Sequence, residues 1–310
     1  MYRTFIGGAL SALALSTAAA SAKDITVTWI AGNAALQTEH RIRDGFNQHV
    51  TETGVEGWNV TYLDSAGSAE KVANNIQDAV SRGSDFIVVT VADLRASESA
   101  LADAEKAGIP VFTADSGWIP GVVTDVTTNN WQMASEVSLA LVGKMRGRGN
   151  LVVLTASGIK PVRERTDTLR AILNEYPNIK IIAEHDLNVA NFYQDAMNAT
   201  QDIATRFGDE VDAVWAPWDE PAQAAVTALA AAGLTDVPVS GMDGHQTALD
   251  AICAENSSFL VTGRQQFEVW GAKLATSIKR VAEDGETPEA IKVSDIEYLP
   301  ATLFTRADCE

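Results

Sequence analysis

The sequence predicts an α/β protein built from two doubly wound lobes, and three features of the chain support this prediction. Its 310 residues are enough for two domains, and 46% of them are hydrophobic, as in a folded chain. Short runs rich in Val and Ile alternate with amphipathic stretches of helical length. Runs such as Phe86-Ile87-Val88-Val89 are apolar without interruption, which is typical of parallel strands covered on both faces. Repeated strand–helix units of this kind form doubly wound sheets.

In the first half of the chain, strands and helices are expected to alternate. The apolar residues recur with the period of a strand in one kind of segment and with the period of a helix in the other. The expected strands are 25–31, 58–64, 85–90 and 110–114, and the expected helices are 39–51, 70–81 and 96–107.

The same pattern restarts after Thr127-Thr128-Asn129-Asn130. Expected strands are 150–155, 179–185, 212–216, 237–242 and 258–263, with helices 131–146, 161–175, 193–207, 220–232 and 267–283, a short helix ending near Cys253, and two short terminal strands. Because no flexible linker separates the halves, we expect two closely joined lobes.

The first residues have the pattern of a cleaved secretory signal. Arg3 precedes an apolar run over 5–15, and Ala20-Ser21-Ala22 is a small-x-small cleavage site. The apolar run is shorter than the ~20 residues that span a bilayer. We therefore expect a signal peptide over 1–22, a mature chain that begins at Lys23, and export to an oxidising compartment. There Cys253 and Cys309 are expected to form a disulfide, with two independent buried thiols as the alternative.

Charge and motif content exclude several classes of function. The formal net charge of −18 disfavours binding to nucleic acid or to anionic membranes. The four histidines lack metal-binding spacing, and the chain contains neither a Gly-x-Ser-x-Gly elbow nor a phosphate-binding Gly-rich loop. We therefore expect no metal, no cofactor and no enzymatic activity.

Acids, amides, an arginine and tryptophans recur after the expected strands. Ligands of open α/β sheets bind at this edge, where the carboxyl ends of the strands meet. Carboxylates and amides bind pairs of hydroxyl groups, and an aromatic face covers apolar C–H patches. The candidate ligand-binding residues are Gln37, Glu39, Asp115, Trp118, Arg165, Asn191, Phe192, Trp218, Asp243 and Gln265. This set predicts a site for a polyhydroxylated ring.

Several motifs, taken in order along the chain, resemble the ribose-binding-protein family of periplasmic solute receptors, the type I binding proteins of ABC sugar importers. They include Ala107-Gly108-Ile109-Pro110-Val111-Phe112-Thr113-Ala114-Asp115, Arg163-Glu164-Arg165, Trp218-Asp219-Glu220 and Gly241-Met242-Asp243-Gly244. The resemblance covers essentially the whole chain after Lys23. It implies two Rossmann-like lobes with parallel sheets, joined by a three-strand hinge. The implied lobes are 23–128 plus 266–294 and 129–265 plus 295–310, with crossings near 128–129, 265–266 and 294–297.

The resemblance also implies roles for four residues. Asp115 would accept from two sugar hydroxyls, Arg165 would donate to sugar oxygens, Asp243 would be the second acid, and Gln265 would be an amide near the hinge.

Departures from the family pattern affect the stacking face. The chain has Gln37-Thr38-Glu39 where the family places an Asn and an aromatic pair, and Ser116 where an arginine often follows the acid. Trp218 replaces an Asn, and either Asn191 or Phe192 replaces an aromatic residue. Stacking is then expected from Trp218 and Trp118. These departures disfavour ribose itself, and the expected ligand is a class, namely a pentose, an unusual sugar or an acyclic polyol, rather than any one named sugar.

Other interpretations of these residues remain open at this stage. Trp218 also fits core packing, and Glu39 also fits a charge at a helix N-terminus. Asp219 is expected to cap the helix that begins at Glu220, and Arg163 is expected on a solvated face.

The expected function is that of a monomeric periplasmic protein that captures a sugar or sugar alcohol and delivers it to the membrane permease of an ABC importer. A chemotaxis or signalling receptor for a small non-sugar ligand is one alternative, and a secreted sugar-processing enzyme is a remote one.

Overall fold

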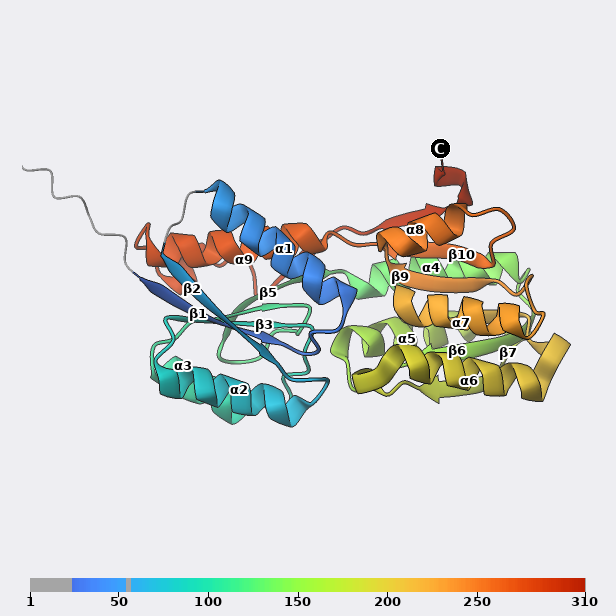
Figure 1. The fold of residues 1–310 in the computed structure, drawn as a ribbon, viewed down its shortest axis with the longest axis horizontal. Helices are drawn as coiled ribbons and strands as arrows, with labels where there is room; N and C mark the ends of the chain where they lie inside the picture. Colours follow the sequence, from blue (N-terminus) through green and yellow to red (C-terminus); the bar gives the residue numbers. More distant parts are fainter. Residues whose placement is uncertain (1–23, 54–56, 310) are drawn as a thin grey trace, which may run out of the picture.

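The computed structural model describes residues 24–53 and 57–309, so the expected signal peptide lies outside the described residues. Two six-stranded sheets each form the centre of one lobe, and the lobes lie end to end (Figure 1). The first sheet has the order β11-β5-β4-β3-β1-β2 and the second has the order β12-β10-β9-β8-β6-β7. This confirms the predicted α/β class with two doubly wound lobes.

The first lobe contains strands from both ends of the chain. They are β1 (Ile25–Ala31), β2 (Trp58–Asp64), β3 (Phe86–Thr90), β4 (Val111–Ala114), β5 (Val122–Thr128) and β11 (Ile296–Leu299). Helices α1 (Gln37–Glu52) and α9 (Phe267–Ala282) cover one face, and α2 (Ala69–Arg82) and α3 (Glu98–Lys106) cover the other (Figure 1). A short helix, α10 (Pro288–Ile291), follows α9.

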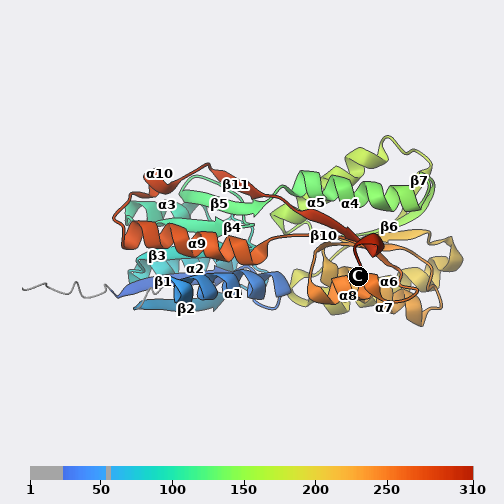
Figure 2. The same ribbon diagram turned by 90° about the horizontal axis from the view of Figure 1, so that it is seen from above.

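The second lobe repeats this arrangement with one difference at its edge. Its strands are β6 (Gly149–Thr155), β7 (Ile179–Asp186), β8 (Ala213–Trp215), β9 (Val239–Asp243), β10 (Phe259–Arg264) and β12 (Thr302–Thr305). One face is covered by α4 (Asn130–Lys144) and α5 (Lys160–Leu173), and the other by α6 (Phe192–Phe207), α7 (Asp219–Ala231) and α8 (Gln246–Cys253) (Figure 2). The β10–β12 pair is antiparallel, so this sheet is not wholly parallel as predicted.

Local sequence fixes where several helices begin and end. The Ser68 side chain caps α2 by accepting from the Lys71 N–H, and Gly83 ends this helix with a φ of 70°. The Asn129 side chain caps α4 in the same way, accepting from Gln132. Asn129 thereby starts the second lobe at the point where β5 leaves the first.

Three connections join the lobes, between β5 and α4, between β10 and α9, and between β11 and β12. The third differs from the expectation in position. Ile296–Leu299 pairs in parallel with Asp125–Thr128 of β5, so these residues belong to the first sheet rather than to the second lobe. The chain therefore crosses at 300–301, after the expected 294–297, because backbone pairing with β5 holds β11 in the first lobe.

Close backbone packing joins α1 and α9 in the first lobe. A Cβ atom on Gly271 would lie 1.9 Å from the Ile42 carbonyl oxygen, and one on Gly45 would lie 2.1 Å from that of Glu268. Only glycine fits at either position, since real Cβ contacts are never this short. The buried Phe46, Phe267 and Trp270 fill the space beside this contact.

The C-terminal segment is fixed to the second lobe. Cys253, at the end of α8, is disulfide-bonded to Cys309, with a Cα–Cα distance of 5.6 Å. Across residues 24–53 and 57–309, the helices are all too short or too polar to cross a membrane.

Candidate functional site

A narrow pocket lies where the two lobes meet. It is lined by Leu36, Thr38, Val91, Asp115, Ile159, Pro161, Val162, Arg165, Trp218 and Asp243. Its volume is about 30 Å³. The lobes are therefore drawn tightly together around the pocket.

Three pocket residues at the ends of strands have left-handed or related backbone conformations. Val91 follows β3 with a φ of 48°, Asp115 follows β4 with a φ of 53°, and Asp243 ends β9 with a φ of 139°. Non-glycine residues rarely adopt positive φ, and each such residue costs of order 1–3 kcal/mol. In each case this conformation directs a side chain from the sheet edge into the space between the lobes.

Asp115 is the buried acid of the first lobe. Its Oδ1 accepts from the Thr127 hydroxyl at 2.6 Å and from the Asn130 amide at 3.4 Å. Burial raises the pKa of Asp115, while the charge of Arg165 opposes this rise. The Asp115 carboxyl group is therefore shielded from solvent and is placed to accept hydrogen bonds from a ligand in the pocket.

Arg165 is held by three contacts within the second lobe, and its charge also acts on Asp115 of the first lobe. Its Nε donates to the Asn130 side chain at 2.7 Å, and its NH1 donates to the Pro217 carbonyl at 2.8 Å. NH1 is also 3.6 Å from Oδ1 of Asp243. Because the side chain is 4% exposed, its charge is paired within the protein rather than with water.

Asp243 is the buried acid of the second lobe. Its Oδ1 accepts from the Gln265 amide at 2.7 Å, and its Oδ2 accepts from the Thr38 hydroxyl of α1 at 3.4 Å. The Gln265 Oε1 atom is buried and has no hydrogen-bond partner within the protein. Gln265 itself does not line the pocket, so its described role is to hold the Asp243 carboxylate in place.

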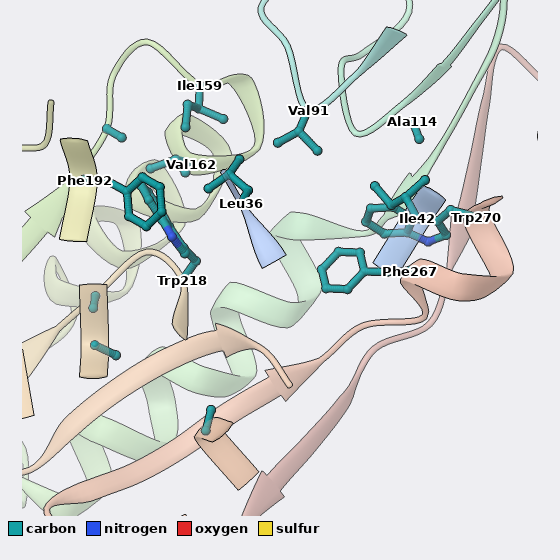
Figure 3. Close-up of a cluster of buried hydrophobic side chains, with 14 of the residues drawn as sticks. Leu36, Ile42, Val91, Ala114, Ile159, Val162, Phe192, Trp218, Phe267 and Trp270 are labelled. Carbon is teal, nitrogen blue, oxygen red and sulfur yellow. The ribbon is translucent and has the colours of Figure 1, made fainter. Parts of the chain in front are cut away.

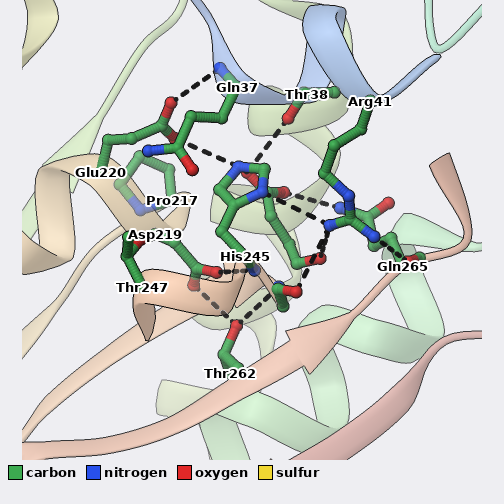
Figure 4. A network of polar contacts seen from close by, with 12 residues as sticks. Gln37, Thr38, Arg41, Pro217, Asp219, Glu220, His245, Thr247, Thr262 and Gln265 are labelled. Atoms are coloured by element: carbon green, nitrogen blue, oxygen red, sulfur yellow. Dashed lines mark hydrogen bonds and ion pairs between the residues drawn. The ribbon is translucent and has the colours of Figure 1, made fainter. Parts of the chain in front are cut away.

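His245 forms a second layer of polar contacts behind Asp243 (Figure 4). Its Nε2 lies 3.3 Å from Asp243 and 3.5 Å from Glu220. Burial opposes a positive charge on the ring, but hydrogen bonds to these two carboxylates raise the pKa of His245 to about 10. The two carboxylates therefore favour the positively charged form of the His245 ring.

Arg41 of α1 extends this layer across the gap between the lobes. Its NH1 is 3.4 Å from Nδ1 of His245 (Figure 4). NH1 is also 3.3 Å from the Gly244 carbonyl oxygen, and Nε forms an ion pair of 2.6 Å with Glu268. The Gln37 N–H donates to Glu220 at 3.1 Å. The first turns of α1 therefore dock on the loops of the second lobe.

A further ion pair joins the lobes at the rim of the pocket. Arg163 NH1 lies 2.8 Å from Asp93, which follows β3 in the first lobe. Burial works against the Asp93 carboxylate, but Arg95 and Arg163 together lower the pKa of Asp93 below its usual range. The expectation that Arg163 lies on a solvated face is wrong, because this residue pairs across the interface.

Asp219 does not cap the helix as predicted. Helix α7 begins at Asp219 itself, and the carboxylate is buried, accepting from the His245 N–H at 2.9 Å and from the Thr262 hydroxyl at 2.6 Å. Burial and the nearby Asp243 charge raise the pKa of Asp219 to about 7. This residue ties the β8, β9 and β10 ends together.

The predicted aromatic residues divide between pocket and support. Trp218 lines the pocket and is 4% exposed, and the Phe192 ring packs edge-on against it at 5.6 Å. Asn191 is exposed and does not line the pocket. Phe192 therefore supports Trp218. Asn191 is the residue just before α6, and it is exposed rather than part of the pocket lining.

Two other candidates point away from the pocket. Glu39 lies beneath α1, where its carboxylate accepts from Trp29 Nε1 at 2.6 Å and from the Thr90 hydroxyl at 2.5 Å. Trp118 packs against the apolar core under α2 and α3, with Lys292 5.3 Å from its ring centroid. The stacking face predicted from Trp118 is thus absent from the pocket.

The second polar layer and the aliphatic lining have little signature in the sequence. A lone histidine such as His245 carries no motif, although its place directly after Asp243-Gly244 is a usable signal. Leu36, Val91, Ile159 and Val162 are ordinary apolar residues in sequence, and only the meeting of two lobes brings them together.

Glu220, Asp243 and His245 offer three ligand atoms within 4.8 Å of one another, which is a possible metal-binding geometry. The surroundings of these three residues fit a proton on His245 better than a bound metal ion. Nε2 of His245 lies at ion-pair distance from both acids, and the positive charges of Arg41 and Arg165 border the same group.

The chain matches known solute receptors over most of its length. The family model described as a periplasmic binding protein domain matches residues 18–287. The ribose import binding protein of Salmonella typhimurium is 30% identical over 76% of this chain and 78% of its own length. The xylitol-binding protein of Mycolicibacterium smegmatis is 26% identical over 86% of this chain and 74% of its own length.

A solved structure agrees with these matches. An ABC transporter solute-binding protein from Agrobacterium vitis with bound allitol superposes with a TM-score of 0.82 at 26% identity, covering 92% of this chain and 97% of that one. The family match, the ordered motifs and the two-lobed fold agree with the resemblance found in the sequence. The chain therefore belongs to the periplasmic binding protein family.

Proposed function

We propose that this protein captures a sugar or sugar alcohol between its lobes and delivers it to an ABC importer. The observation that carries the proposal is the meeting of Asp115 from the first lobe with Arg165 and Asp243 from the second in one buried pocket. Alternating acids and a guanidinium can accept from and donate to neighbouring hydroxyl groups. The relatives named for ribose and xylitol, and the allitol complex, support this class of ligand.

Ligand capture in this proposal proceeds by opening and closure about the three connections. The pocket lies between the lobes and its polar residues are buried, so the lobes must separate to admit a sugar and then close around it. Contacts with both lobes favour the closed state, which the importer would recognise. The Arg163–Asp93 pair and the docking of α1 add interlobe contacts that hold the closed state.

A thermal-shift screen followed by calorimetry tests this proposal. A ligand present at about 1,000 times its dissociation constant should stabilise the protein by ~4 kcal/mol, which raises the midpoint by several degrees. Asp243→Asn should weaken binding at least tenfold, since the Arg165 and His245 contacts lose their anion. Asp236→Asn, on the exposed approach to β9, is the matched control and should bind normally. A shift with amino acids or nucleosides and none with sugars or polyols would refute the proposed ligand class.

The remaining parts of the proposal concern location and partners. We propose that the chain is exported to the periplasm with Lys23 as its first residue, acts as a monomer, and engages a membrane permease without chemical change to the ligand. N-terminal sequencing of the exported protein tests the first part. Incubating the protein with its ligand and analysing for product tests the last.

A further inference from the structure

We propose that the preferred ligand is a deoxy or alkyl-substituted sugar or polyol, which has hydroxyl groups along one edge and an apolar group at the other. This inference rests on the proposed function, because it assigns a chemical class to the ligand of the same pocket. It comes from the division of the pocket lining into a polar side and an aliphatic side.

The aliphatic side is contributed by both lobes. We call it the apolar wall and define it as Leu36, Val91, Ile159, Pro161, Val162 and Trp218. Five of these residues are also members of one continuous hydrophobic cluster, Pro161 being the exception. Figure 3 shows Leu36 between Val91 of the first lobe and Ile159, Val162 and Trp218 of the second. Apart from the buried indole N–H of Trp218, these six side chains contain no hydrogen-bonding atom.

The polar side forms one connected series. Asp115 accepts from Asn130, Asn130 accepts from Arg165, and Arg165 lies 3.6 Å from Asp243. Thr38 contacts Asp243 from α1. Hydroxyl groups of a ligand would be satisfied along this series, whereas a hydroxyl group directed at the aliphatic side chains of the apolar wall would lose its bonds to water without replacement. A methyl or other alkyl group at that position would instead gain from burial.

Val91 provides an independent sign that the wall serves a ligand. A β-branched residue with a φ of 48° is a conformational outlier, and glycine or asparagine would adopt this backbone more easily. The conformation is held in place by close packing, because a Cβ on Gly32 would lie 2.0 Å from the Val91 carbonyl oxygen. A strained residue that places an aliphatic side chain in a binding pocket points to a functional need for that side chain.

Matched pairs of ligands test the inference directly. Calorimetric titrations would compare L-rhamnose with L-mannose, L-fucose with L-galactose, and terminally deoxygenated D-ribose with D-ribose. In each pair the two members differ by a methyl group in place of a hydroxymethyl group. We expect the deoxy member to bind at least tenfold more tightly in every pair that binds.

A variant of the wall provides the second arm. Val91→Asn suits the left-handed backbone, so the protein should remain folded, yet it places an amide on the wall. We expect this variant to reduce the deoxy preference at least fivefold. Ala66→Asn is the matched control, since Ala66 also has a positive φ, of 49°, but does not line the pocket. It should leave the preference unchanged.

The possible outcomes separate this inference from the proposed function. Tighter binding of the hydroxylated parents, or equal affinities within the pairs, would overturn the inference and leave sugar binding intact. An unchanged preference in Val91→Asn would also overturn it, because the wall would then not face the ligand. If no sugar, deoxy sugar or polyol binds the wild-type protein, the proposed function itself fails.

Discussion

Replacing Glu39 by glutamine should remove a pH-dependent cost to folding. The Glu39 side chain is 1% exposed, and burial raises its pKa from 4.5 to about 7, although the Thr90 and Trp29 hydrogen bonds oppose the rise. A difference of that size corresponds to ~3 kcal/mol, at ~1.4 kcal/mol for each pH unit between the two pKa values. The ionised form of this carboxyl group is therefore markedly unfavourable in the folded protein.

The direction in which stability changes with pH follows from proton binding to Glu39. Between pH 4.5 and about 7 the folded state holds a proton on Glu39 that the unfolded state has released. Stability therefore falls as pH rises through this window, and the full cost is present above it. Glutamine preserves both contacts, because its oxygen can accept from Trp29 and its amide can donate to the Thr90 oxygen, but it cannot ionise.

Chemical denaturation followed by tryptophan fluorescence measures the effect. Relative to wild type, Glu39→Gln should be of similar stability near pH 4.5 and more stable at pH 8, by up to ~3 kcal/mol. Glu105→Gln, on the exposed surface of α3, is the control and should show little difference between the two conditions. A stability difference between Glu39→Gln and wild type that is the same at both pH values would refute the reasoning.

Three further predictions concern packing, the disulfide and the rim of the pocket. Gly271→Ala should destabilise the protein by about 2–4 kcal/mol in denaturant melts because its Cβ would strike α1, whereas Gly143→Ala, which has open space around it in α4, should be neutral or stabilising. Reducing the disulfide should cost up to ~4 kcal/mol, since it closes a loop with a sequence separation of 56, and equal melting points with and without reductant would contradict this. Arg163→Gln should weaken ligand binding about fivefold in calorimetry by loosening the closed state, while Arg170→Gln, whose ion pairs lie within the second lobe, should bind as wild type. Equal affinities of both variants would show that the Asp93 pair does not contribute to closure.

Much of the fold could be predicted from the sequence because local pattern and tertiary environment agree. The uninterrupted apolar residues of β3 are all buried, and the Asn129 cap stands where the second lobe begins. The prediction failed at β11, where none of the four residues is fully buried and the hydrophobic pattern is weak. Their lobe is decided by pairing with β5, a contact between segments about 170 residues apart, which local sequence does not encode.

The sequence predicts where the site residues lie along the chain better than it predicts which way their side chains point. Asp115, Arg165, Trp218 and Asp243 follow strands or begin helices at the sheet edge, so topology alone brings them together. Glu39 is only two residues into α1, yet its side chain turns toward the sheet. The helical period decides which face of α1 carries Glu39. Whether the carboxylate on that face meets Trp29 or the pocket depends on tertiary packing.

The way the C-terminal elements complete both sheets has a consequence for biosynthesis. The first lobe needs α9 against the buried Ile42 and Phe46 of α1, and it needs β11 at its edge. The second lobe needs β12, which follows β11 directly. A nascent chain that ends before residue 296 can therefore complete neither sheet, so final folding of both lobes must wait until almost the whole polypeptide has been made.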